Sequence, residues 1–128
     1  MGTLLSVAAG GALGAAARYG LGGWIQQVTG SVFPWGTVII NVTGSLALGF
    51  LVIWLQAAMA SVELRAFLTV GVLGGYTTFS TLSYETVAMV QDGDFVRAAW
   101  YALGSFALGL LGAFGGMALA HQLLRGPA

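Results

Sequence analysis

Neutral hydrogen-bond donors recur within long apolar runs of this sequence, at spacings that place them on common helix faces. The groups are Thr37, Asn41 and Ser45; Tyr101 and Ser105, on a face that continues bare at Gly109 and Gly112; and a dense run of Thr, Ser and Tyr that begins at Thr77 and ends at the acid Glu85. Polar side chains are costly inside a membrane, so each needs a protein partner or a water-lined cavity. Three polar stripes in apolar surroundings predict a hydrophilic path.

The chemistry expected of this path is the replacement of water around a small anion. Ser, Thr and Tyr hydroxyls and the amide of Asn41 all offer a hydrogen to donate. The acid nearest the path is Glu85, and no ring of Lys or Arg is present to hold a large anion. Neutral donors suit a small, strongly hydrated anion, which must be compensated for lost water without being trapped. The positive edge of the Phe79 ring fits the same role.

Helix packing is the alternative explanation for these polar and small residues. Ser and Thr often bond to the carbonyl of their own helix, and small residues four apart let helices approach closely. For any single Ser or Thr this explanation is favoured, and for Phe79 it stays open. Asn41 differs, because an amide in mid-span needs several partners. The close-approach pairs are Gly10 with Gly14, Gly71 with Gly75, Ser105 with Gly109, and Gly112 with Gly116.

Composition requires that these residues be carried by helices in a membrane. The chain has 128 residues, of which 58% are hydrophobic and 6% charged, whereas soluble domains carry about 25% charged residues. A span needs about 20 apolar residues, so the prediction is an all-α membrane protein with four transmembrane helices. Trp residues near the span ends fit an interfacial belt. The single transmembrane domain, 1–128, has predicted spans at about 4–24, 35–58, 64–90 and 95–124.

A pair of glycines, Gly74-Gly75, interrupts the predicted third span and breaks its helix. The break has two interpretations. It is either a kink, or an unwound segment whose carbonyls bind a monovalent cation, as in the discontinuous helices of transporters.

The number of Arg residues on each side of the membrane predicts how the chain is oriented in it. Four spans place both termini and the middle loop on one side, together with Arg65 and Arg125. Arg97 lies on the other side, and Arg18 joins it if its side chain extends toward the nearer span end. The positive-inside bias is then zero, which predicts copies inserted both ways and an antiparallel dimer. A chance balance of charges with a buried Arg18 is the alternative.

Several function classes are excluded by what the sequence lacks. Net charge is zero and Lys is absent, so no basic surface exists for nucleic acid. There is no Cys, and His121 has no second ligand nearby in sequence. No nucleophile–base pair, carboxylate pair or phosphate loop is present, so we do not expect an enzyme.

The run from Gly71 to Thr81, GVLGGYTTFST, resembles the signature of the Fluc (CrcB) fluoride channel family. Two further stretches agree with it: Gly10 to Gly14 leading to Arg18, and Gly36-Thr37 leading to Asn41 and Gly44. The resemblance covers all four predicted spans.

The resemblance implies a passive fluoride-selective channel in the inner membrane of a prokaryote, which exports fluoride and protects the cell from its toxicity. It also implies a dual-topology antiparallel homodimer with a structural sodium ion. Asn41 and Phe79 would contact fluoride, Arg18 would match a basic position of the family, and carbonyls of Gly74 and Thr77 would hold the sodium. The remaining pathway residues are Thr37, Ser80, Tyr101, Ser105 and Glu85.

The sequence departs from the family motif at two positions, and two other functions are alternatives to a fluoride channel. Leu82 stands where the family motif usually has a second Phe, which leaves room for a second, related subunit that supplies it. Gly109 stands where Ser is sometimes found. A proton-coupled exporter needs an acid in its first span, and this span carries only Arg18. A structural assembly helper would explain the small residues and leave the polar path unused.

Overall fold

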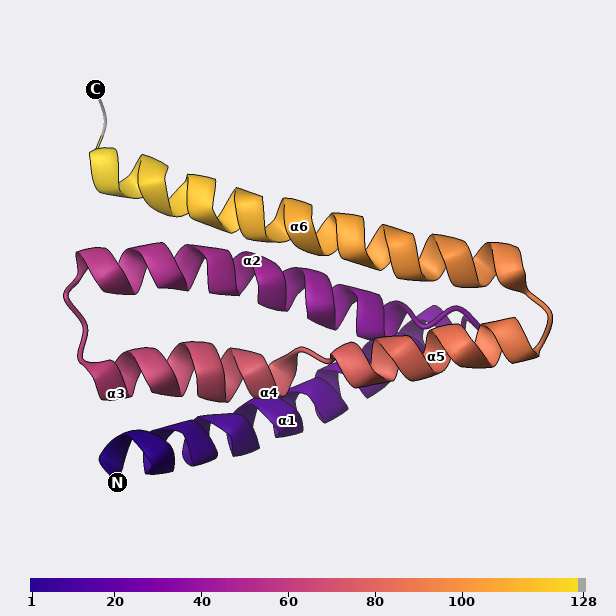
Figure 1. Cartoon of the computed structure of the whole chain (residues 1–128), viewed down its shortest axis with the longest axis horizontal. Coiled ribbons are helices and arrows are strands. Elements are labelled where there is room, and N and C mark those ends of the chain that lie inside the picture. Colours follow the sequence, from indigo (N-terminus) through magenta and orange to yellow (C-terminus); the bar gives the residue numbers. More distant parts are fainter. Residues whose placement is uncertain (127–128) are drawn as a thin grey trace.

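The computed structural model describes residues 1–126, and long helices make up most of this range (Figure 1). Three of them are continuous, and the remaining segment is assembled from four short helices in series. The elements are α1 (Gly2–Thr29), α2 (Trp35–Ala57), α3 (Val62–Arg65), the π-helix η1 (Ala66–Leu73), α4 (Gly74–Tyr76), α5 (Phe79–Gln91) and α6 (Phe95–Arg125).

The helices alternate in direction, so the start of α1, the α2–α3 loop and the end of α6 lie at one end of the molecule (Figure 1). The α1–α2 and α5–α6 connections lie at the other end. The start of α1 and the end of α6 thus share a side with the middle loop, as the four-span prediction requires. The helices α2 and α6 run side by side in the same direction and form the most extensive contact between elements.

The helices α1, α2 and α6 are each long and apolar enough to cross a membrane. The helix α1 extends beyond the predicted span of 4–24 at both ends. The third segment, 62–91, contains the predicted third span but is divided into shorter pieces. The prediction of a helical, multi-pass membrane protein is therefore confirmed.

The predicted break at Gly74-Gly75 is wrong. Gly74 has helical angles (φ −64°, ψ −37°), and both glycines belong to α4. The chain instead leaves the helix at Thr77 and Thr78, whose ψ values are 157° and 112°. The glycines serve close packing: a Cβ on Gly75 would lie 2.6 Å from the carbonyl oxygen of Gly11.

Glycines lie where the helices approach one another most closely. A Cβ on Gly14 would overlap the carbonyl oxygen of Val72 in η1, and one on Gly116 would overlap that of Leu46 in α2. Gly10, Gly71 and Gly112 are approached by backbone in the same way. The predicted close-approach glycine pairs are thus confirmed, and they bring α1 against η1 and α6 against α2.

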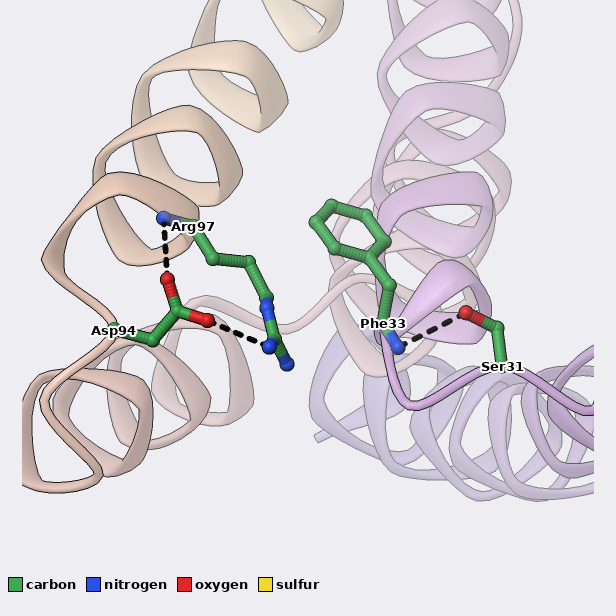
Figure 2. Close-up of polar contacts among 4 residues, drawn as sticks. All are labelled: Ser31, Phe33, Asp94 and Arg97. Atoms are coloured by element: carbon green, nitrogen blue, oxygen red, sulfur yellow. Dashed lines mark hydrogen bonds and ion pairs between the residues drawn. The ribbon is translucent and has the colours of Figure 1, made fainter.

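Side chains fix the turns. In the α1–α2 connection, the Ser31 hydroxyl accepts a hydrogen bond from the Phe33 amide at 3.0 Å (Figure 2). At the start of α6, Asp94 accepts from the Arg97 amide at 3.1 Å and pairs with its guanidinium at 2.6 Å (Figure 2). Ser61 caps α3 by accepting from the Leu64 amide at 3.2 Å.

Candidate functional site

Glu85 on α5 joins three helices through its carboxylate. The Thr37 hydroxyl of α2 donates to Oε1 at 3.2 Å, and the Tyr101 hydroxyl of α6 donates to Oε2. Tyr101 is only 1% exposed, and its ring lies edge-on to Phe33. Three of the predicted pathway residues therefore meet at one point, and two of them already direct their hydrogens at the acid.

Asn41 bonds to the backbone at the break in the third segment. Its Oδ1 accepts from the Thr78 amide at 2.7 Å, and its Nδ2 donates to the Thr78 carbonyl at 3.0 Å. Thr78 is 7% exposed, and a buried backbone group without a partner would cost free energy comparable to a lost hydrogen bond. Asn41 thus replaces the helical partners of an extended residue. One hydrogen of its amide nitrogen remains available for another acceptor.

The break also releases two carbonyls. In a continuous helix the Thr78 amide would bond to the Gly74 carbonyl, and the Thr81 amide to the Thr77 carbonyl. Here the Thr78 amide donates to Asn41, and the Thr81 amide donates to the Thr78 hydroxyl at 3.2 Å. The carbonyls of Gly74 and Thr77 are therefore left without their usual amide donors.

Six of the Ser and Thr side chains follow the packing explanation, whereas those of Thr37 on α2 and Ser105 on α6 do not. The hydroxyls that donate to the carbonyl four residues earlier are those of Ser6, Thr43, Thr69, Thr77, Ser83 and Thr86. Thr37 bonds to Glu85 instead. Ser105 is 6% exposed, and its hydroxyl has no hydrogen-bond partner among residues 1–126.

Phe79 lies apart from this group, and Ser80 reaches it only through the Thr78 hydroxyl, 3.4 Å from its own. The Phe79 side chain is 81% exposed at the start of α5, and Ser80 is exposed beside it. Leu82, which replaces the expected second Phe, packs against a core cluster that includes Tyr101 and Val38. The single chain therefore brings Thr37, Asn41, Glu85, Tyr101 and Ser105 onto facing helices but leaves Phe79 outward.

A cleft of about 1080 Å³ opens at the end of the molecule away from the termini, between α1, the start of α2 and α5. Thr37, Thr78 and Glu85 line it, so the cleft reaches the polar group. Arg18 and Arg97 also line it, and the guanidinium of Arg97 extends from α6 toward the loop with Ser31 and Phe33 (Figure 2).

Sequence reasoning missed Thr78 as a site residue. It is the residue whose extended backbone binds Asn41 and whose hydroxyl caps α5. The available signal was the position of a Thr directly before a helical run, because Thr is a common N-cap. Because several Thr and Ser residues follow one another from Thr77 onward, the sequence does not show which of them ends the helix.

We expect Tyr101→Phe to lower the free energy of unfolding by about 1–3 kcal/mol, because a carboxylate oxygen of the half-buried Glu85 loses its donor. Tyr84→Phe is the matched control, since Tyr84 is 75% exposed on α5. Thermal melting of both variants in detergent measures the difference. Equal melting temperatures for the two variants would show that the Tyr101–Glu85 bond contributes nothing.

A helical multi-pass protein whose neutral donors gather inside an apolar bundle, beside a cleft that reaches them, has the make-up of a membrane channel or carrier. Comparison with known proteins places it more closely. The chain belongs to the CrcB family: the family model described as "CrcB-like protein, Camphor Resistance (CrcB)" matches residues 5–117.

Curated relatives cover nearly the whole chain. A protein of Thermus thermophilus is 52% identical over 121 residues, which are 94% of each chain. Proteins of Rhizobium meliloti and Geobacter sulfurreducens are each 45% identical, over 97% and 96% of this chain and 100% of their own. All three are named "Fluoride-specific ion channel FluC". The relatives are thus ion channels by name, as expected for a chain without catalytic motifs.

Proposed function

We propose that the protein is a fluoride-specific ion channel that exports fluoride passively across the cell membrane and so protects against fluoride toxicity. The observation that carries the proposal is the group of uncharged donors around Asn41, which lies in the membrane-spanning region of a chain whose full-length relatives are fluoride channels by name. The cell (inner) membrane is the proposed location.

The donors differ in what they can offer a passing ion. Asn41 retains one amide hydrogen, and Ser105 retains its hydroxyl hydrogen. Thr37 and Tyr101 donate to Glu85, so a fluoride ion at their level would compete with that carboxylate. Asn41 and Ser105 would hold a small anion through uncharged donors, without a positively charged side chain between them to trap it.

A proton-coupled exporter is supported less well. Such a mechanism needs an ionisable acid within the span that binds the substrate, and α1 contains no Asp or Glu. The one ionisable acid among the site residues is Glu85, and it is engaged by two hydroxyls. Passive movement of the anion needs no such group.

A second copy of the chain would complete the site. Phe79 and Ser80 follow the break near the middle of the third segment and are exposed. Non-helical backbone and polar groups at that depth need cover from protein or water. We therefore propose an antiparallel homodimer in which Phe79 of each copy faces the pathway, although a second, related subunit would also fit.

The dual-topology part of this proposal rests on the equal division of Arg residues between the two ends. A reporter fused to the C-terminus, active on one side of the membrane only, should be active in part of the population, and a reporter of the opposite kind should be active in the rest. A single orientation for all copies would refute it.

A sodium ion fits the break, because backbone carbonyls freed from helical bonds are ligands for monovalent cations. The carbonyls of Gly74 and Thr77 would hold the ion, which would supply positive charge beside the Asn41–Thr78 bonds. We expect the purified protein to lose melting temperature when sodium is replaced by a large organic cation. An unchanged melting temperature would argue against these ligands.

Growth tests the function in cells. A bacterial strain made fluoride-sensitive by loss of its own exporter should regain growth in fluoride when it expresses this chain. Empty vector is the control. Equal inhibition with and without the chain would contradict the proposed function.

A further inference from the structure

The helices α2 and α6 keep a fixed register along their contact, which we call the α2/α6 seam. Thr37 and Tyr101 bond to the same carboxylate and are 64 residues apart (101 minus 37). Further along, a Cβ on Gly49 would lie 3.0 Å from the carbonyl carbon of Ala113, again 64 residues on (113 minus 49). Because the helices run in parallel (Figure 1), residues with about this separation lie near one another, and Gly112 and Gly116 contact backbone atoms of residues 66 and 70 positions earlier along the same seam.

The register places a further polar residue on the seam. One turn beyond Thr37 and Tyr101 lie Asn41 and Ser105, and one turn further lie Ser45 and Gly109. The last pair is observed directly: a Cβ on Gly109 would lie 3.6 Å from the Ser45 hydroxyl oxygen. Ser45 therefore occupies the level at which α6 offers no side chain.

Ser45 faces open space at this level. A cavity of about 230 Å³ lies between α2 and α6, and apart from Ser45 its lining is apolar. The other residues that line it are Leu48, Gly49, Val52, Ala113 and Met117. Within residues 1–126 the Ser45 hydroxyl also makes none of the bonds to its own helix that Thr43, two residues earlier, makes with Ile39.

Ser105 supplies independent evidence that the seam is built for a ligand. Its hydroxyl is buried and without a partner in the described part of the chain, and it lies one turn before Gly109. Buried polar groups are nearly always satisfied, so an orphan hydroxyl calls for a missing acceptor or donor. An anion or a water molecule moving along the seam would provide one.

We propose that Ser45 is a further ion-contacting residue, whose hydroxyl takes over the fluoride ion one turn beyond Asn41 and Ser105. The inference rests on the proposed channel function and extends its pathway. Ser45 supplies from α2 the hydroxyl that Gly109 does not supply from α6. The other residues that line the adjoining cavity carry no donor side chain, so Ser45 is the last donor along it.

Fluoride efflux from liposomes tests this assignment with three variants. Ser45→Ala should slow efflux about tenfold or more, because a hydrogen bond to a charged group is lost. Ser45→Ala combined with Gly109→Ser moves the hydroxyl from α2 to the facing position on α6 and should restore most of the efflux rate. Gly109→Ala alone, which adds a methyl group at ordinary contact distance from Ser45, controls for crowding. Melting temperatures are measured in parallel.

The outcomes separate the inference from the function. If the unmodified protein carries fluoride and Ser45→Ala carries it equally fast, the role of Ser45 is refuted and the channel function stands. A slowed Ser45→Ala that Gly109→Ser does not restore would also contradict it, since a structural role would explain the loss. No fluoride efflux through the unmodified protein would overturn both.

Discussion

Asn41→Asp is expected to reduce fluoride efflux to the rate of protein-free liposomes. The carboxylate keeps an acceptor for the Thr78 amide but removes the donor to the Thr78 carbonyl. It also places a negative charge where fluoride must pass. Like charges about 4 Å apart repel by about 4 kcal/mol at an effective dielectric constant of 20, which corresponds to roughly a thousandfold in rate.

A matched variant of α2 shows whether the effect of Asn41→Asp depends on the position of the new negative charge or only on its presence. Gln56→Glu makes the same amide-to-acid replacement at an exposed residue near the end of α2. We expect it to leave efflux unchanged. Liposome assays of both variants, with size-exclusion profiles to confirm folding, decide the matter. Undiminished efflux through a folded Asn41→Asp channel would show that Asn41 lies off the path.

Gly116→Ala is expected to destabilise the protein strongly, by about 3 kcal/mol or more. Its Cβ would overlap the Leu46 carbonyl oxygen and lie 2.7 Å from the Phe50 amide nitrogen. Both are backbone atoms of α2, so the whole helix must move away. Since the α2/α6 seam carries the proposed donors, efflux should fall along with stability.

The neighbouring glycine provides the control. A Cβ on Gly115 would meet nothing within 4 Å, and Ala is favoured over Gly in a helix by roughly 0.5–1 kcal/mol. Gly115→Ala should therefore melt at the same temperature as the unmodified protein or slightly higher. Equal melting temperatures for Gly115→Ala and Gly116→Ala would contradict the observed close packing of α6 on α2.

The sequence predicts the number and order of the spans because lipid imposes length and apolar composition on each of them. It does not locate the break in the third segment. Glycine permits a break without requiring one, and Gly75 is needed where α4 packs on Gly11. The break occurs at Thr78, where Asn41 from another helix satisfies the backbone. That partner is far away in sequence, so no local pattern reveals it.

The candidate site is predictable in its residue types and only partly in its geometry. Spacing alone places Thr37, Asn41 and Ser45 on one face of a helix. That this face meets Tyr101 and Ser105 depends on the parallel register of α2 and α6, which their interlocking glycines set. The position of Glu85 between Thr37 and Tyr101 depends on α5, whose direction follows from the break before it.

The central claim is that uncharged donors along the α2/α6 seam replace the hydration of fluoride. The most direct test is efflux from liposomes that contain fluoride and chloride together and carry the purified protein. The account predicts rapid loss of fluoride while chloride stays inside, because these donors compensate the small ion and carry no positive charge themselves that would attract the larger one. Loss of both ions at similar rates would contradict it.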